Sequence, residues 1–138
     1  MTPPPLVLLV DDDADFTAIH RRVLETQGFR VACAEGPAAA REAVARERPD
    51  AVVTDLMMQR LDDGFAFARE LKADPATAAI PVILVTAASG RMGFNFAPRG
   101  PQDLAEMGVD AWFAKPVPAA ALAARLRDLI ASARNPAP

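Results

Sequence analysis

The sequence has few of the residues that build disulfide-linked or zinc-stabilised folds. Its 138 residues include one cysteine, Cys33, and one histidine, His20. A single cysteine excludes an internal disulfide and a cysteine-based metal site. We therefore expect Cys33 to be a small buried strand residue. A lone histidine within a helical pattern is most often structural or exposed, so no chemical role is expected for His20.

The sequence also lacks long apolar runs and an excess of positive charge. No apolar stretch approaches the roughly 20 residues of a membrane span, and residues 1–5 lack the charged and apolar regions of a signal peptide. Fifteen Lys and Arg against eighteen Asp and Glu give a formal net charge of −3. No overall basic field is therefore available to hold nucleic acid or an anionic membrane surface. We expect a cytoplasmic protein that binds neither nucleic acid nor membrane.

Length and hydropathy favour one domain. A chain of 138 residues that is 51% apolar can bury one sizeable core, and it is too short for two comfortable domains. We expect a single domain over residues 1–138, with a core from about residue 6 to residue 133 and proline-rich tails at both ends.

Strand and helix patterns alternate along the chain. Runs of apolar residues predict buried strands, and apolar residues at spacings of three and four predict amphipathic helices. The predicted strands are 6–10, 29–34, 51–55, 80–85 and 111–114. Residues 87–101 follow neither pattern and are expected to form a long loop. The predicted helices are marked by Phe16, Ile19, Val23 and Leu24, by Ala39, Ala40, Ala43 and Val44, by Phe65, Ala68 and Leu71, by residues 102–107, and by Leu122, Leu126, Leu129, Ile130 and Ala133.

This alternation predicts an α/β fold, a parallel sheet of five strands with right-handed crossovers and helices on both faces. Open sheets of this kind bind ligands at the carboxyl ends of their strands. Five polar side chains follow or end predicted strands there: Asp11, Asp12, Asp55, Thr86 and Lys115.

These five side chains suit a phosphoryl-transfer site. Three carboxylates at one edge would repel each other without a cation, and a set of oxygen ligands suits Mg²⁺ or Mn²⁺. The Lys115 ammonium and the Thr86 hydroxyl can each contact a phosphoryl oxygen. Asp55 can then act as a nucleophile toward phosphorus and form an aspartyl phosphate. The attacking carboxylate is already ionised, so the reaction needs no general base.

The same residues carry a resemblance to a known family. Over residues 6–133 the sequence resembles the receiver domain of two-component response regulators, similar to chemotaxis regulators. The motifs stand in the family's order on the expected strand ends: VDDD at Val10–Asp13, TDLMM at Thr54–Met58, VTA at Val85–Ala87 and KP at Lys115–Pro116.

The resemblance implies a flavodoxin-like doubly wound sheet with strand order 2-1-3-4-5. It also implies a cis bond between Lys115 and Pro116. By the same resemblance, Asp55 is the phosphoacceptor, Asp11 and Asp12 hold Mg²⁺ together with Asp55 and the backbone carbonyl of Met57, Thr86 and Lys115 bind the phosphate, and Thr86 and Trp112 form the conformational switch.

Three segments depart from the family pattern. After Asp55, Gln59 replaces the usual proline and the following loop is about one residue longer. The stretch GFNFAPRGP adds residues between Thr86 and Lys115, which resembles a subgroup with a GFxF-type insertion after the fourth strand. Its two phenylalanines form either a partner site or, as we favour, a structural plug. Trp112 stands where receivers usually place a switch tyrosine.

The leading functional hypothesis is a stand-alone receiver that accepts a phosphoryl group from a sensor histidine kinase or a phosphotransfer protein. It would catalyse only its own phosphorylation and dephosphorylation, and would signal to an unknown downstream protein by contact. One alternative is a receiver-like module that binds its partner without phosphorylation. A phosphohydrolase of the haloacid dehalogenase type is disfavoured, because Met57 stands where that family places a second acid.

Overall fold

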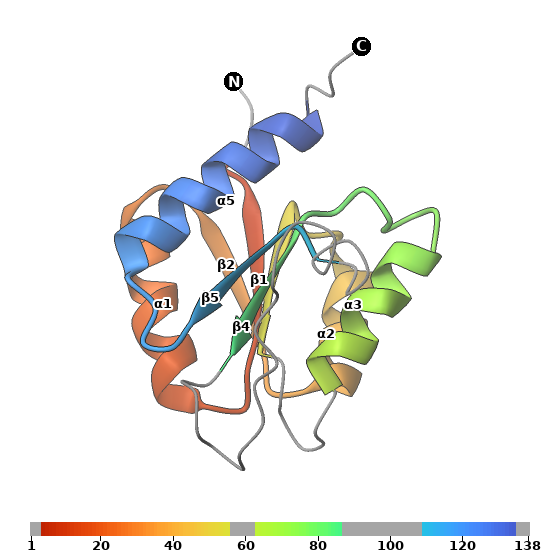
Figure 1. The fold of residues 1–138 in the computed structure, drawn as a ribbon, viewed down its shortest axis with the longest axis horizontal. Coiled ribbons are helices and arrows are strands. Elements are labelled where there is room, and N and C mark those ends of the chain that lie inside the picture. Colours follow the sequence, from red (N-terminus) through yellow and green to blue (C-terminus); the bar gives the residue numbers. More distant parts are fainter. Residues whose placement is uncertain (1–3, 56–62, 87–108, 135–138) are drawn as a thin grey trace.

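The protein is described by a computed structural model that covers residues 4–55, 63–86 and 109–134, in which strands and helices alternate (Figure 1). The predicted loop at 87–101, the predicted helix at 102–107, Met57 and Gln59 lie outside the described residues. The elements are β1 (Leu6–Val10), α1 (Ala14–Thr26), β2 (Arg30–Ala34), α2 (Pro37–Arg46), β3 (Ala51–Asp55), α3 (Asp63–Ala73), β4 (Val82–Thr86), β5 (Ala111–Ala114) and α5 (Ala119–Arg134). None of the helices within these ranges combines the length and the apolar character needed to span a bilayer.

The five strands form one parallel sheet in the order β2-β1-β3-β4-β5. This is the order of flavodoxin-like doubly wound sheets, and it confirms the predicted fold. Helices α1 and α5 cover one face of the sheet, and α2 and α3 cover the other (Figure 1). All five strands therefore end at the same edge.

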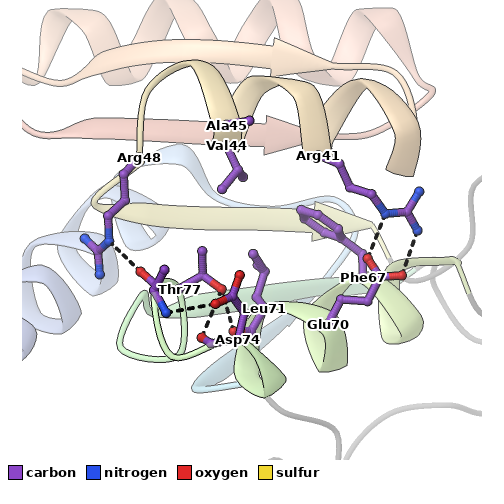
Figure 2. Close-up of a pocket in the computed structure, with 10 residues that line it drawn as sticks. Arg41, Val44, Ala45, Arg48, Phe67, Glu70, Leu71, Asp74 and Thr77 are labelled. Carbon is purple, nitrogen blue, oxygen red and sulfur yellow. Dashed lines mark hydrogen bonds and ion pairs between the residues drawn. The ribbon is translucent and has the colours of Figure 1, made fainter.

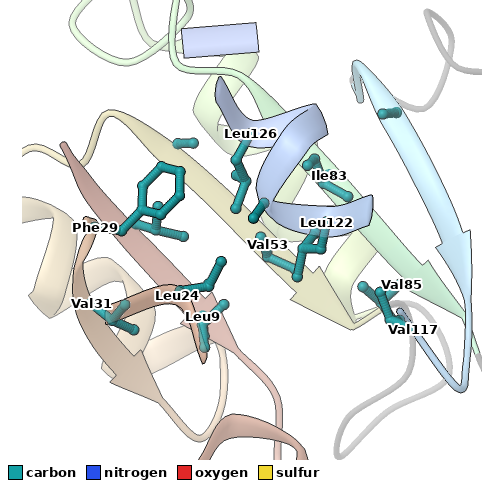
Figure 3. Close-up of a cluster of buried hydrophobic side chains, with 14 of the residues drawn as sticks. Leu9, Leu24, Phe29, Val31, Val53, Ile83, Val85, Val117, Leu122 and Leu126 are labelled. Atoms are coloured by element: carbon teal, nitrogen blue, oxygen red, sulfur yellow. The ribbon is translucent and has the colours of Figure 1, made fainter. Parts of the chain in front are cut away.

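The pleat of the strands divides the core into two layers. Because successive strand side chains point to opposite faces, Leu9 and Val53 pack with Leu24 and Leu126 on the face covered by α1 and α5 (Figure 3). The alternate residues of the same strands pack with α2 and α3. Strands β1, β3 and β4 are buried along their whole length, as strands covered on both faces of a parallel sheet are expected to be.

Helix α1 begins and ends at residues suited to those positions. The Asp13 carboxylate accepts the backbone N–H groups of Asp15 and Phe16 and so caps the amino end of the helix, a role that aspartate fills well. Gly28 follows the carboxyl end with a φ of 96°, a conformation that favours glycine. The helix therefore starts directly after the acidic residues of the β1 end.

The predicted buried face of α1 is wrong at one position. Ile19 is 59% exposed, and the buried residues are Phe16, His20 and Leu24. These three recur every four residues and form one stripe, whereas Ile19 lies one position to the side. The apolar pattern favoured Ile19 because histidine is not counted as a core residue, yet His20 occupies that place.

Cys33 is exposed, and the prediction that it is buried is wrong. Its strand, β2, is the edge of the sheet and has a neighbouring strand on one side only. The strand is accordingly less buried than β1, β3 and β4. An edge position cannot be recognised from a five-residue strand pattern alone.

Three further helices differ in detail from the prediction. In α2 the buried residue is Ala40, while Ala39 is exposed, and in α5 Ala133 is exposed. In α3 the side chain of Phe67 is almost wholly buried beside Ala68, and the spacing argument did not single it out. Helices α2 and α5 are rich in alanine, so their faces differ little in apolar character and spacing defines those faces poorly.

A matched pair of substitutions on α1 tests the assignment of its buried face. Leu24→Ala removes a side chain with 0% exposure and leaves a cavity, so we expect the free energy of unfolding to fall by about 2–5 kcal/mol. Ile19→Ala, on the exposed face of the same helix, should change it by no more than about 0.5 kcal/mol. Urea denaturation followed by circular dichroism measures both, and similar losses would contradict the assignment.

Candidate functional site

The acidic residues meet where β1 and β3 end side by side. The two strands are neighbours with Val10 opposite Thr54, so the next residues, Asp11 and Asp55, face each other across the strand ends. One carboxylate oxygen from each of Asp11, Asp12 and Asp55 lies within 4.8 Å of the others. Asp11 is 2% exposed, Asp55 is 7% exposed, and Asp12 faces solvent. The predicted acidic cluster is therefore assembled from two strand ends.

Lys115 supplies the positive charge of this cluster. Its Nζ lies 2.8 Å from Asp11 Oδ2 and 3.8 Å from Asp55 Oδ2. Its backbone N–H donates to the carbonyl oxygen of Thr86 at 2.8 Å, which fixes Lys115 next to the end of β4. The Lys115–Pro116 peptide bond is cis, as the family resemblance implies.

The surroundings of Lys115 stabilise its charged form. Burial by itself lowers the pKa of the ammonium, but the close contact with Asp11 and the charges of Asp55, Asp11 and Asp13 outweigh burial, so the pKa of Lys115 is raised. A raised pKa means that the ammonium stabilises the fold fully below its ordinary value of 10.5. That contribution is lost only as the pH rises through the higher pKa of the folded state. At neutral pH the ammonium is therefore a fixed charge in the site.

The two oxygens of Asp11 have different partners. Oδ1 accepts the backbone N–H of Asp13 at 2.8 Å, which orients the carboxylate. Oδ2 receives no N–H or O–H in hydrogen-bonding geometry from the described residues, although the Lys115 ammonium lies within ion-pair distance. A buried carboxylate oxygen that accepts no hydrogen bond is suited to a cation as its partner.

The oxygen ligands of the cluster fit a divalent metal ion. Carboxylate oxygens are the ligands that Mg²⁺ and Mn²⁺ prefer, and Mg²⁺ is commonly held by one or two carboxylates together with waters and phosphate oxygens. Asp11, Asp12 and Asp55 would supply the protein oxygens. Asp12 is exposed, so one of the three carboxylates is open to solvent.

Thr86 and Trp112 lie on the opposite face of the sheet from Asp55, because Asp55 pairs with Val85 and side chains alternate along a strand. Thr86 ends β4 opposite Ala114, and Trp112 pairs with Leu84. Leu84 packs in the layer of α2 and α3, with the partly buried Trp112 against it, and Thr86 follows Leu84 at the same parity. The structure thus places both residues predicted for the switch on one face, with Thr86 reaching Lys115 through its backbone carbonyl.

Two residues of α1 belong to the site although the sequence did not indicate it. Lys115 Nζ lies 4.7 Å from the centroid of the Phe16 ring, within the range of a cation–π interaction. The Phe16 ring in turn stacks on the imidazole of His20, with centroids 4.1 Å apart. Spacing identified Phe16 as a core residue, but no sequence pattern shows that its ring faces an ammonium from β5.

A cavity of about 370 Å³ lies between α2 and α3, away from the acidic cluster (Figure 2). Phe67, Leu71 and Val44 form its apolar lining. At its rim Arg41 donates two hydrogen bonds to Glu70, at 2.7 and 2.8 Å, and these hold the pKa of the Glu70 carboxyl below its usual value. None of the lining residues is a carboxylate of the cluster, so the cavity and the strand-end site are separate features.

The chain is similar to known proteins in family, sequence and fold. A family model described as the response regulator receiver domain matches residues 7–127. Response regulator PleD of Caulobacter vibrioides is 38% identical over 124 residues, and response regulator MprA of Mycobacterium leprae is 36% identical over 124 residues. The matched parts cover 89% and 90% of this chain but 25% and 50% of the two relatives. The chain thus spans half or less of the length of these relatives.

The fold is also found among solved structures. The signal receiver domain of a signal transduction histidine kinase from Syntrophus aciditrophicus is 26% identical, with a TM-score of 0.78. The match covers 96% of this chain and 95% of that one. The fold that holds the strand-end site is therefore matched along almost the whole chain.

Replacing Lys115 by methionine tests how far the ammonium holds the acidic cluster together. The variant keeps an unbranched side chain but leaves Asp11 and Asp55 without the cation, so we expect the free energy of unfolding in metal-free buffer to fall by about 1–3 kcal/mol. Millimolar Mg²⁺ should recover part of this loss, because a divalent ion compensates the same carboxylates. Urea denaturation at pH 7.5 with EDTA or with Mg²⁺ provides the measurement.

The double variant Lys115→Met with Asp11→Asn is the control. Removing one carboxylate relieves the repulsion, so the double variant should be more stable than Lys115→Met alone in EDTA. If Mg²⁺ instead stabilised both variants equally, the ion would act elsewhere on the protein.

Proposed function

The chain belongs to the response regulator receiver family, and from this premise we propose that it accepts a phosphoryl group on the Asp55 carboxylate from a histidine kinase or a phosphotransfer protein. Receiver domains are signalling modules that take phosphoryl groups from histidine kinases. The observation that supports the proposal for this chain is the placement of the Lys115 ammonium, 2.8 Å from Asp11 Oδ2 and 3.8 Å from Asp55 Oδ2. A fixed cation next to an ionised carboxylate is what an incoming phosphoryl group requires.

The transfer itself breaks one bond to phosphorus and forms another. An oxygen of Asp55 attacks the phosphorus of a phosphohistidine, an O–P bond forms and the N–P bond breaks. The electron pair of that bond stays on the imidazole nitrogen of the donor, which remains as neutral histidine or takes a proton from solvent. A bound Mg²⁺ would supply positive charge for the phosphoryl oxygens. Asp55 needs no base, because its carboxylate is already the nucleophile.

The other residues of the site have distinct roles in this proposal. Lys115 contacts one oxygen of the phosphoryl group, and the Thr86 hydroxyl donates a hydrogen bond to another. Asp11, Asp12 and Asp55 would hold Mg²⁺, and the family resemblance adds the backbone carbonyl of Met57 as a further ligand. Catalysis would then consist of positioning and charge neutralisation by groups already in place.

The signal would leave the site through Thr86 and Trp112. If the Thr86 hydroxyl turns toward the phosphoryl group, it vacates space on the face of the sheet where Trp112 packs. Phosphorylation then shifts the population toward a state with a rearranged Trp112, and a downstream protein that binds this state better reads the signal. Output by protein contact follows from this mechanism.

Intact mass spectrometry tests the acceptor directly. We expect the chain to gain one phosphoryl group on incubation with a small acyl phosphate or phosphoramidate and Mg²⁺, and to gain none without Mg²⁺ or as Asp55→Asn. Asp15→Asn, which removes an exposed acid of the same part of the chain outside the cluster, should behave as the wild type. Absence of any mass gain in a folded wild type that binds Mg²⁺ would favour the alternative of a module that works without phosphorylation.

Trp112 is the only tryptophan of the chain, so its fluorescence reports on the proposed switch. We expect the emission to change when the phosphodonor is added, with the same time course as the gain in mass. Thr86→Ala should still gain the phosphoryl group but lose most of the change in fluorescence, because it lacks the hydroxyl that links the phosphoryl group on Asp55 to Trp112. An unaltered fluorescence change in Thr86→Ala would exclude Thr86 as that link.

A further inference from the structure

His20 joins helix α1 to the connection between β5 and α5. Its Nδ1 lies 2.9 Å from the carbonyl oxygen of Phe16, one turn earlier on the helix, and its Nε2 lies 3.2 Å from the carbonyl oxygen of Val117. The side chain is 7% exposed. Val117 comes two residues after Lys115 and packs in the core layer under α1 and α5 (Figure 3). One imidazole therefore contacts the backbone of its own helix and that of a segment 97 residues further along the chain.

The same imidazole supports the Lys115 side chain from a second direction. The Phe16 ring stacks on it at 4.1 Å, and the Lys115 ammonium lies 4.7 Å from the centroid of the Phe16 ring. His20 thus contacts the Phe16 ring, which lies next to the Lys115 ammonium. It also contacts the backbone at Val117, two residues after Lys115. No described contact joins His20 to Asp11 or Asp55, so its influence on the site passes through Lys115.

We propose that His20 is a positioning residue for Lys115, which fixes the ammonium between Asp11 and Asp55 by holding the Val117 carbonyl and the Phe16 ring. This inference rests on the proposed phosphoryl transfer, since it gives His20 a part in the rate of that reaction. It also makes a structural statement about Lys115 that holds whether or not the chain is phosphorylated.

The hydrogen-bonding capacity of imidazole explains why an apolar residue would not serve equally well. Each ring nitrogen faces a carbonyl oxygen, which can only accept, so a nitrogen must carry a proton to make a hydrogen bond there. The Phe16 carbonyl belongs to a helix, while the Val117 carbonyl lies in a connection outside strand and helix. The contact that distinguishes histidine from leucine at this position is therefore Nε2 to Val117.

Two variants of similar size separate this contact from simple core packing. His20→Leu fills the same buried place and removes both ring nitrogens. His20→Gln is also of similar length, and its terminal amide nitrogen reaches about where Nε2 lies, so it keeps a donor for Val117. Ile19→Ala, on the neighbouring exposed position, is the control for a change on α1 that leaves the site untouched.

The rate of phosphorylation by a small phosphodonor is the first measurement. We expect His20→Leu to lower the maximal rate about tenfold, which is less than the roughly hundredfold that a misplacement of about 1 Å can cause. The concentration of Mg²⁺ that gives half of the maximal rate should not change, because His20 touches none of the carboxylates. His20→Gln should restore most of the rate, and Ile19→Ala should match the wild type. If His20 only stabilised the fold, His20→Leu would change the maximal rate and the half-maximal Mg²⁺ concentration together. His20→Gln would then not restore the rate.

The position of the ammonium is measured independently by NMR. The chain has two lysines, Lys72 and Lys115, so their side-chain ε-methylene signals can be resolved and assigned with Lys72→Arg. Ring current from Phe16 should shift the Lys115 signal upfield, and His20→Leu should reduce this shift while His20→Gln preserves it. Phe16→Leu gives the value without the ring.

The two measurements distinguish failure of this inference from failure of the proposed function. If the wild type takes up no phosphoryl group, the proposed function fails and the NMR comparison alone decides the position of Lys115. If the wild type is phosphorylated but His20→Leu matches it in rate and in the Lys115 signal, the inference is overturned and the proposed function stands.

Discussion

The constraint on which the site depends is the repulsion between two buried carboxylates at adjacent strand ends. Asp11 and Asp55 are almost inaccessible to solvent, so water screens their charges poorly. The fold answers this repulsion with one ammonium, that of Lys115, and leaves an oxygen of Asp11 with no hydrogen bond from the described residues. Among the described residues, the cluster of Asp11, Asp12 and Asp55 with Lys115 therefore carries a net negative charge. Such a cluster is prepared to bind further positive charge and, once that is bound, a phosphoryl group.

The strand order explains why a long side chain directly after β5 can reach both carboxylates. Strands β1 and β3 are neighbours, which places their terminal carboxylates side by side, whereas β5 is separated from β3 by β4. With neighbouring strands about 4.8 Å apart, β5 lies about 10 Å from β3. A long unbranched side chain can cross the end of β4 and reach both carboxylates. The hydrogen bond from the Lys115 N–H to the Thr86 carbonyl fixes the point from which it starts.

The sequence predicted most of the fold because four strands are apolar along most of their length and the helices between them have clear periodicity. The errors have physical causes. Cys33 was expected in the core because a short strand pattern does not show that its strand is an edge, and Ile19 was expected there because the buried stripe of α1 runs through His20 instead. The strand-end residues were found because parallel strands end at one edge. The contact between Phe16 and Lys115 was not found, since it joins segments that are distant in the sequence and involves residues of ordinary type.

Helix α1 has a larger part in the site than a covering element would have. Its capping residue, Asp13, donates its backbone N–H to Asp11 Oδ1 while its carboxylate holds the first turn of the helix. One turn on, Phe16 lies under the ammonium, and one further turn on, His20 holds the segment after Lys115. The same rigid helix therefore orients one carboxylate of the cluster and the cation opposite it. A displacement of α1, for instance by a protein that binds its exposed face, would move Asp11 and Lys115 together. It would change the charges around Asp55 without a direct contact to Asp55.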